Sequence, residues 1–374
     1  MPPLAWRNLL YDKIRLVATL TGVTFAVVLI VVELGLFCGF RETTSCLIDN
    51  SHADIWVSTP NVAYLELGAA FNDRKIYQMK TVPGVADVQK YIVRTTLWKR
   101  LDGGFQTIEI VGFNPTANMG GPWSLEQGRV QDLQISDGVI VDEVYKEKLG
   151  VKHIGEVFEI NGHRARVVGF TRGIRSFATL PYVFTSLQHA YDFAPVPEDQ
   201  TIFALVKIEP GADVEAVRRA ISSRVTNVNV LTNLEFSRKT RKYWTFATGA
   251  GLAVLLAAVL GLVVGFVVVS QTIYSTTMDH LKEFGTLKAM GAPNSYVYKV
   301  ILTQAGIAAV IGYALGMVIS SFVVYFGRGA GAPILWNWWM ATGIFFVTLF
   351  MCGGAALVSI NKVAWLDPAT VFKG

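Results

Sequence analysis

The amino-acid sequence predicts a membrane protein with four transmembrane helices and a large α+β extracytoplasmic domain inserted between helices 1 and 2. Hydrophobic residues make up 52% of the 374 residues. Charged residues make up 16%, which is well below the roughly 25% of soluble domains. Four apolar runs approach or exceed the ~20 residues that cross a bilayer. They occupy residues 16–40, 243–273, 297–326 and 336–360. The mixed-polarity residues 41–242 are numerous enough to fold as a domain of their own.

The first apolar run is expected to be an uncleaved membrane anchor. Its apolar core exceeds the ~7–15 residues of a signal peptide. Residues 1–15 precede it as a basic amphipathic helix at the cytoplasmic interface. Glu33 is an ionisable residue within the run, and such residues are candidate proton relays. At about 1.5 Å per residue it lies about 27 Å from Arg15, near the far interface, so we favour snorkelling or a hydrogen bond to a neighbouring helix.

Residues 41–242 alternate between short strand patterns and short helix patterns, which predicts an α+β domain. Asp-Gly and Asn-Gly turns indicate two hairpins, at residues 95–113 and 157–170. The other expected strands are residues 53–58, 182–185 and 201–208 and the start of 138–150. The expected helices are residues 73–81, 186–191 and 213–225 and the end of 138–150. The Gly- and Pro-rich residues 114–128 are expected to divide two lobes.

The domain contains no convincing set of catalytic or metal-binding residues. His153 and His163 have no nearby cysteine or suitably spaced carboxylate, so both are expected at the surface or in turns. Asp142 and Glu143 are adjacent at a strand-to-helix turn, where capping or exposure is the favoured interpretation. Motifs of serine and zinc hydrolases are missing from the sequence. We therefore expect no catalytic residue, no metal site and no enzymatic activity in this chain.

Several small or basic residues near the spans are candidates for packing or surface contacts. Glycines four residues apart in the second and third spans are expected to let helices approach closely: Gly261, Gly265, Gly312 and Gly316. A membrane-proximal basic cluster precedes the second span: Arg238, Lys239, Arg241 and Lys242. It is interpreted either as a contact with membrane lipid headgroups or as a solvated flanking segment.

Residues 277–294, TMDHLKEFGTLKAMGAPN, predict a short amphipathic helix between the second and third spans. Its apolar residues recur at three-residue spacing and form a stripe: Met278, Leu281, Phe284, Leu287 and Met290. Gly291 and Pro293 then end the helix. By pattern alone, this helix is either an interfacial anchor or a docking surface for a partner.

The distribution of charged and aromatic residues predicts the orientation of the chain. Lysines and arginines near the span ends are slightly more numerous on the side that holds both termini, which favours a cytoplasmic position. Residues 274–296 then form a cytoplasmic loop, 327–335 a short external loop and 361–374 a cytoplasmic tail. Aromatic residues are expected at the external interface and at the cytoplasmic one: Tyr243, Trp244, Trp336, Trp338 and Trp339 outside, and Trp6 and Trp365 inside.

The loop between the second and third spans resembles the cytoplasmic signature of MacB/FtsX-like permeases of ABC transporters. Residues 283–292, EFGTLKAMGA, have an acidic residue and a glycine, then a leucine, a basic residue and Ala-x-Gly-Ala. Phe284 and Lys288 stand where an aliphatic residue and an arginine are more usual. Residues 4–15 are similar to the family's N-terminal helix, and residues 143–170 resemble part of its outer domain. The resemblance covers nearly the whole chain.

Within that family the chain looks most like DevC-type or LolC/LolE-type subunits without an ATPase domain of their own. The sequence has no G-x-x-x-x-G-K-[ST] phosphate loop, so a separate cytoplasmic ABC ATPase that binds ATP and Mg is implied. The resemblance also implies a second copy or a paralogue of the permease. It further implies a periplasmic adaptor, an outer-membrane channel and a location in the bacterial inner membrane. No nucleic-acid partner is expected.

The resemblance assigns an ATPase-coupling role to the loop helix: Leu281, Lys282, Glu283, Phe284, Gly285, Leu287, Lys288, Met290 and Gly291. Nucleotide-driven closure would move the second and third spans and shift the outer domain, a mechanism called mechanotransmission. The expected function is export of a hydrophobic or amphiphilic cargo. The alternatives are extraction of lipids or lipoproteins from the inner membrane and FtsX-like signalling to a cell-wall hydrolase. A membrane-bound enzyme has the least support.

Overall fold

The computed structural model describes residues 13–177, 180–280, 283, 285–287, 290–329 and 332–364. It divides into two compact units. The helical unit takes in the chain up to Gly39 and from Leu252 onward, and the second unit is Phe40–Gly251. Trp6, Trp365 and most of the predicted helix 1–15 and tail 361–374 lie outside the described residues.

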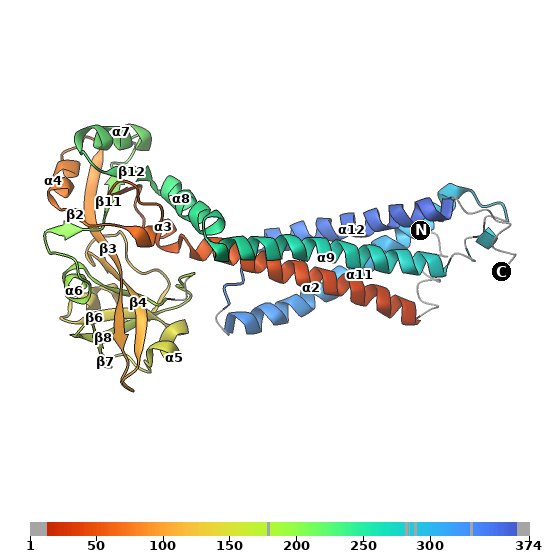
Figure 1. The fold of residues 1–374 in the computed structure, drawn as a ribbon, viewed down its shortest axis with the longest axis horizontal. Helices are drawn as coiled ribbons and strands as arrows, with labels where there is room; N and C mark the ends of the chain where they lie inside the picture. Colours follow the sequence, from red (N-terminus) through yellow and green to blue (C-terminus); the bar gives the residue numbers. More distant parts are fainter. Residues whose placement is uncertain are drawn as a thin grey trace. The chain divides into compact units, whose positions relative to one another are not determined.

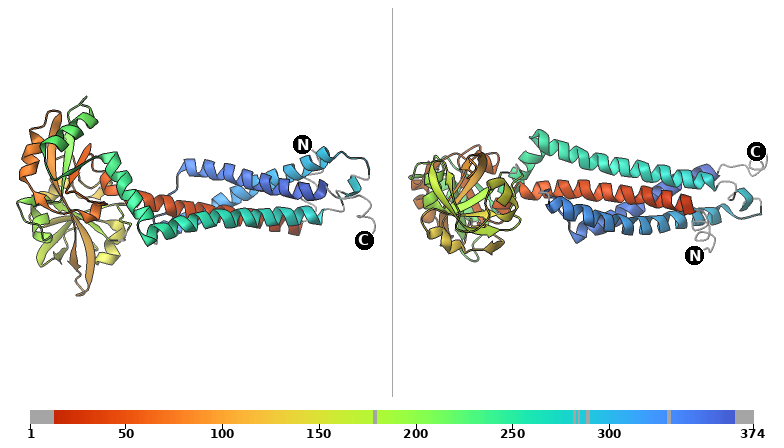
Figure 2. Two further views of the ribbon diagram at one scale, coloured as in Figure 1. Left: turned by 45° about the horizontal axis from the view of Figure 1, so that its top comes forward. Right: turned by 90° about the horizontal axis from the view of Figure 1, so that it is seen from below.

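Four long helices lie side by side in the helical unit (Figures 1 and 2). They are α2 (Lys13–Thr43), α9 (Gly249–Asp279), α11 (Asn294–Gly329) and α12 (Trp338–Ala364). Each contains a segment that is long and apolar enough to cross a membrane, with mean hydropathies between 2.2 and 3.1. The predicted four-helix membrane architecture is therefore confirmed.

The second membrane helix has different bounds from those predicted. It begins at Gly249 instead of residue 243, because Thr248 Oγ1 accepts a hydrogen bond from the Gly251 N–H at 3.1 Å and caps the new helix. It also continues to Asp279, beyond the predicted end at residue 273. Polar residues near this end do not terminate the helix, since the Thr276 and Thr277 hydroxyls donate to carbonyl oxygens one turn earlier.

Helix α2 is the helix against which the predicted glycines pack. A Cβ atom added at Gly312 or at Gly316 would lie 2.6 Å from a side-chain atom of Val23 or Val27. Added at Gly261 or Gly265 of α9, it would meet side chains of α2 at 2.9 and 3.1 Å. The glycines therefore let both α9 and α11 approach α2 closely.

Two glycines of α2 itself, which the pattern analysis missed, play a similar role. Gly35 and Gly39 face the segment before α12, where the Leu335 N–H donates to the Gly35 carbonyl at 2.9 Å. A Cβ at Gly39 would clash with the Pro333 carbonyl oxygen. Glu33 is half-buried against Gly261, and its carboxylate makes no hydrogen bond to any residue that the structure describes.

The second unit contains a mixed sheet that confirms the α+β prediction. Its strands are β1 (Ile55–Ser58), β3 (Val85–Lys99), β4 (Phe105–Phe113), β5 (Leu125–Gln127), β6 (Gly138–Asp142), β7 (Val157–Ile160), β8 (His163–Thr171), β9 (Tyr182–Ser186), β11 (Phe203–Ile208) and β12 (Asn229–Thr232). They follow the order β12-β1-β11-β3-β4-β9-β6-β8-β5, with β7 paired to β3 and β8. A separate small sheet pairs β2 (Phe71–Asn72) with β10 (Gln200–Thr201).

Short helices cover this sheet (Figure 1). The α-helices are α3 (Cys46–Asp49), α4 (Arg74–Lys80), α5 (Lys146–Leu149), α6 (Leu187–Phe193), α7 (Val214–Arg224) and α8 (Asn233–Phe246). The 3-10 helices are η1 (Leu65–Leu67), η2 (Val130–Gln134) and η3 (Glu143–Tyr145). Both predicted hairpins form. The tight turn between β7 and β8 has positive φ at Asn161 and Gly162, 49° and 82°, which this residue pair tolerates.

Strand β3 joins two hydrophobic cores. Its first half, up to Tyr91, pairs with β11, and its second half, from Ile92, pairs with β4. One core packs α4 and α7 on the β11 side, and the other packs the strands from β4 to β8. The predicted division at residues 114–128 is therefore wrong. That segment contributes β5 to one edge of the sheet, and the two halves share β3.

Two glycines of α11, one packed on α2 and one not, provide a test of the packing between these two helices. We expect Gly312→Leu to lower the thermal unfolding midpoint of the detergent-purified protein by about 2–4 °C, since an added side chain forces α11 away from Val23. Gly306→Leu is the matched control, because no described atom lies within 4 Å of a Cβ placed there. Equal midpoints for the two variants would contradict close packing of α11 on α2.

Candidate functional site

The segment between α9 and α11 has a buried side and an exposed side. Met278 and Leu287 are half-buried and pack on the core of the helical unit. His280 is 6% exposed, and its Nδ1 lies 3.1 Å from Glu283 Oε1. In contrast, Glu283 and Thr286 are exposed, and Met290 is 71% exposed. Among the described residues of the segment, Glu283, Thr286 and Met290 are therefore available to a partner, while Leu287 holds the segment to the helices.

The end of this segment is set by its backbone. The Met290 N–H donates to the Thr286 carbonyl at 3.0 Å, and the Ala292 N–H donates to the Leu287 carbonyl at 3.0 Å. Gly291 has φ of 90°, a conformation that a side chain disfavours, and it ends the turn as predicted. Gly285 is buried. The remaining predicted coupling residues lie outside the described residues: Leu281, Lys282, Phe284 and Lys288.

The basic cluster lies in α8, a helix of the extracytoplasmic domain that the pattern analysis placed partly in the second span. A capping box of Thr232 and Glu235 starts this helix. Arg241 points into the domain, where Nε donates to Ser45 Oγ at 2.7 Å and Nη2 donates to Asp49 Oδ2 at 2.6 Å. Ser45 and Asp49 lie at the start and the end of α3, the short helix that follows α2. Arg241 therefore ties the segment that enters the domain to the segment that leaves it.

Tyr243 and Trp244, predicted to mark the membrane interface, belong to the end of α8 and contact aromatic residues of the domain. The Tyr243 ring stacks on the Tyr64 ring with centroids 4.2 Å apart. The Trp244 ring contacts both Tyr64 and Phe177 edge-on. These aromatic contacts orient α8 against the domain.

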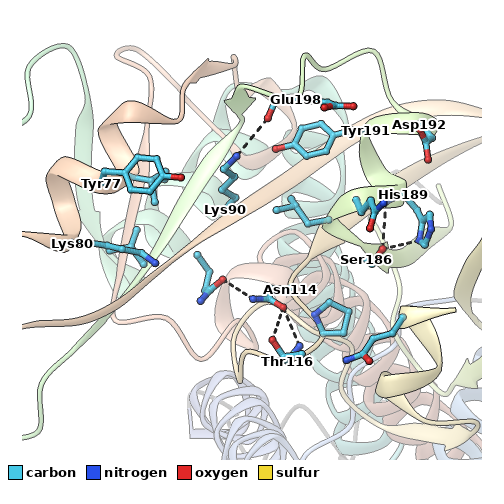
Figure 3. Close-up of a pocket in the computed structure, with 17 residues that line it drawn as sticks. Tyr77, Lys80, Lys90, Asn114, Thr116, Ser186, His189, Tyr191, Asp192 and Glu198 are labelled. Carbon is cyan, nitrogen blue, oxygen red and sulfur yellow. Dashed lines mark hydrogen bonds between the residues drawn. The ribbon is translucent and has the colours of Figure 1, made fainter. Parts of the chain in front are cut away.

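A cavity of about 940 Å³ lies between α4, α6 and β3 of the domain (Figure 3). Lys90 crosses its floor and is bound to Asp73 Oδ2 at 2.9 Å. Asn114 donates to Gln89 Oε1 at 3.1 Å, and its own Oδ1 accepts from Thr116. These polar side chains satisfy one another, and the wall also carries the charged side chains of Lys80, Asp192 and Glu198.

Ser186 and His189 lie on the wall of this cavity and resemble a catalytic pair, with Oγ and Nδ1 2.7 Å apart. His189 Nε2, however, accepts a hydrogen bond from the Asp137 N–H at 3.4 Å. In this tautomer Nδ1 carries the proton and donates to Ser186, so the imidazole cannot remove the serine proton. Ser186 also caps α6 by accepting from the His189 N–H at 3.3 Å. The pair supports a structural role.

The residues singled out for possible catalysis or metal binding have structural roles as well. Asp142 is 1% exposed and accepts hydrogen bonds from Val144 N, Thr171 Oγ1 and Ile174 N. Glu143 forms ion pairs with Lys146 and Arg172. His153 lies in an exposed turn, and His163 begins β8 beside the Asn161–Gly162 turn. Within the described part of the chain, no three His, Cys, Asp or Glu side chains are grouped to hold a metal ion.

Two carboxyl groups with a buried oxygen were missed by the sequence analysis. Glu109 lies in β4, between β3 and β9, and is 3% exposed. Glu66 lies in η1 beside Tyr64. One oxygen of each, Oε2, is buried without a hydrogen-bond partner among the described residues. Strand β4 is buried on both faces over its second half, so no alternation of polar and apolar residues marks Glu109 as unusual.

Burial raises the pKa of both carboxyl groups. Desolvation and then the charge of Glu66 raise the pKa of Glu109 from 4.5 to about 8. Desolvation raises the pKa of Glu66 to about 7, and the backbone N–H of Glu66 and then the nearby Trp244 indole N–H oppose part of this rise. Both groups therefore hold protons in the folded domain at pH values where the unfolded chain has lost them.

This pair predicts a pH dependence of stability. Between pH 4.5 and about 8 the folded domain binds more protons than the unfolded chain, so its stability falls as pH rises. We expect Glu109→Gln, which is neutral at every pH, to raise the unfolding midpoint by about 2–4 °C at pH 8.5 and to change it little at pH 5. The exposed Glu147→Gln is the control, and equal effects of Glu109→Gln at both pH values would contradict the assignment.

Comparison with known proteins identifies both parts of the chain. Residues 16–224 match the MacB-like periplasmic core domain, and residues 255–368 match the FtsX-like permease C-terminal domain. An uncharacterized ABC transporter permease of Mycobacterium tuberculosis, Rv0072, is 23% identical over 99% of both chains. The macrolide export ATP-binding/permease protein MacB of Escherichia coli is 22% identical over 95% of this chain and 58% of that protein.

Two solved structures are similar to about half of the chain. The periplasmic region of MacB from Actinobacillus actinomycetemcomitans is 12% identical, with a TM-score of 0.40, and covers 50% of this chain and 92% of that one. The extracellular domain of the transporter YknZ from Gram-positive bacteria is 16% identical, with a TM-score of 0.37, over 48% of this chain and 98% of that one. Since the periplasmic core match alone covers more than half of the chain, the chain belongs to the MacB/FtsX-like family of ABC transporter permeases.

Proposed function

We propose that this permease couples ATP hydrolysis by a separate ATPase to movement of its extracytoplasmic domain, and that this movement drives export of a hydrophobic or amphiphilic cargo. The observation that carries the proposal is the segment between α9 and α11. It presents Glu283 and Met290 to a partner, while Leu287 within the segment packs on the helical core. Force applied to its exposed side would therefore reach α9 and α11.

The contacts within each unit support a path for this movement. Helix α9 is continuous from Gly249 to Asp279, so a displacement at its Asp279 end would reach its other end. The chain just before Gly249 is α8, whose Arg241 is bound to Asp49 and Ser45. A shift of α9 relative to α2 would exert force on the Arg241–Asp49 ion pair and thereby move the domain.

The partners follow from the same proposal. Two cytoplasmic ABC ATPase subunits would bind ATP and Mg, and a second copy or a paralogue of the permease would complete the transporter. A periplasmic adaptor and an outer-membrane channel would receive the cargo. The chain would lie in the bacterial inner membrane with both termini in the cytoplasm. The full-length similarity to a protein named as a permease supports a transport subunit served by a separate ATPase.

The exposed residues of the coupling segment provide the test. We expect Glu283→Arg combined with Met290→Asp to reduce ATPase co-purification and permease-stimulated ATP hydrolysis about tenfold or more, because central interface residues carry most of the binding energy. Both side chains are exposed, so the variant should still unfold cooperatively, with a midpoint at most about 2–4 °C lower from loss of the Glu283–His280 contact.

The control for this experiment is Glu147→Arg, a charge reversal at an exposed position of the extracytoplasmic domain. It should leave assembly and hydrolysis unchanged. Retention of both activities by the Glu283→Arg/Met290→Asp variant would overturn the docking role. Binding of a cell-wall hydrolase by the domain, with no cargo moved, would instead indicate transmembrane signalling.

A further inference from the structure

The four basic residues of α8 divide into two groups in the structure. Arg241 is bound to Asp49 and Ser45 of the domain. Lys239 and Lys242 make no hydrogen bond or ion pair with any described residue, and Lys242 is exposed. The two ammonium groups are therefore available to an anion from outside the chain.

Lys239 and Lys242 line one groove, of about 320 Å³, together with aromatic and small side chains: Ala63, Tyr243, Phe246 and Ala247. The spacing of three and four residues places the two lysines and the two aromatic residues on one face of α8. The stacking of Tyr64 on Tyr243 holds one wall in place. Phe246 is 65% exposed and leaves an apolar rim beside the cations.

The groove lies close to the bilayer because of the chain itself. Ala247 is two residues before Gly249, where the second membrane helix begins. Two residues span at most about 7 Å, so the groove is near the level at which the chain enters the membrane. Aromatic side chains are enriched at this level, and basic side chains near an anionic membrane surface attract its lipids.

We propose that this groove binds the headgroup of an anionic phospholipid from the leaflet that α9 enters at Gly249. The lipid phosphate would lie between the Lys239 and Lys242 ammonium groups, and Tyr243 and Phe246 would contact the glycerol and the first acyl carbons. Charge selects an anionic headgroup, and the apolar rim next to the membrane helix selects a lipid over a soluble phosphate. The lipid would thus bind to α8, the helix that connects the domain to the second membrane helix.

The experiment uses the full-length protein in a zwitterionic detergent, titrated with phosphatidylglycerol or phosphatidylcholine and followed by native mass spectrometry and thermal unfolding. We expect phosphatidylglycerol to bind and raise the unfolding midpoint, and phosphatidylcholine to do neither. Lys239→Gln/Lys242→Gln should weaken phosphatidylglycerol binding about 30-fold, since each lysine near the surface contributes a factor of about five. Lys239→Arg/Lys242→Arg should preserve binding.

The matched control is Arg238→Gln/Lys152→Gln, which removes the same charge at exposed positions outside the groove and should bind phosphatidylglycerol like the wild type. Equal weakening by both double variants would overturn the site in favour of general charge attraction. Binding by the wild-type protein alone also tests the lipid site. Failure to prefer phosphatidylglycerol, or equal stabilisation by inorganic phosphate, would overturn a lipid site. ATPase binding by Lys239→Gln/Lys242→Gln should be unchanged, which separates this test from that of the coupling segment.

Discussion

Close packing on α2 is the contact on which the helical unit depends. Glycines on α9 and α11 bring both helices against it, and Gly35 and Gly39 of α2 receive the segment before α12. Within a membrane the hydrophobic effect does not drive helices together, so van der Waals contact at small residues supplies much of the association energy.

The extracytoplasmic domain has its own structural link between its two connections to the membrane helices. Arg241 of α8 binds Asp49 and Ser45 immediately after α2. The Tyr64–Trp244 contact extends this link to η1, beside Glu66, whose pKa burial raises. A rigid joint at this point is what a permease needs if movement of its helices is to act on the domain.

Long periodic or apolar features could be predicted from the sequence, and features that depend on tertiary contact could not. The four apolar runs and the Asn161–Gly162 turn are local signals, and both were predicted. The start of α9 at Gly249 depends on the Thr248 cap, and the chain before it is too apolar and aromatic to reveal the break. Glu109 was missed because β4 is covered on both faces. The different roles of Arg241 and the neighbouring lysines could not be predicted, because Arg241 meets Asp49 only when α3 packs on α8.

The central claim is that movement of the membrane helices reaches the extracytoplasmic domain through Arg241. The most direct measurement is the distance between spin labels at positions 152 and 325 of one chain, in the assembled transporter with and without ATP, after the three native cysteines are replaced by alanine. The wild-type distance should change with nucleotide. In Arg241→Gln the change should be lost while ATP hydrolysis continues. The same nucleotide-dependent change in Arg241→Gln would contradict the account.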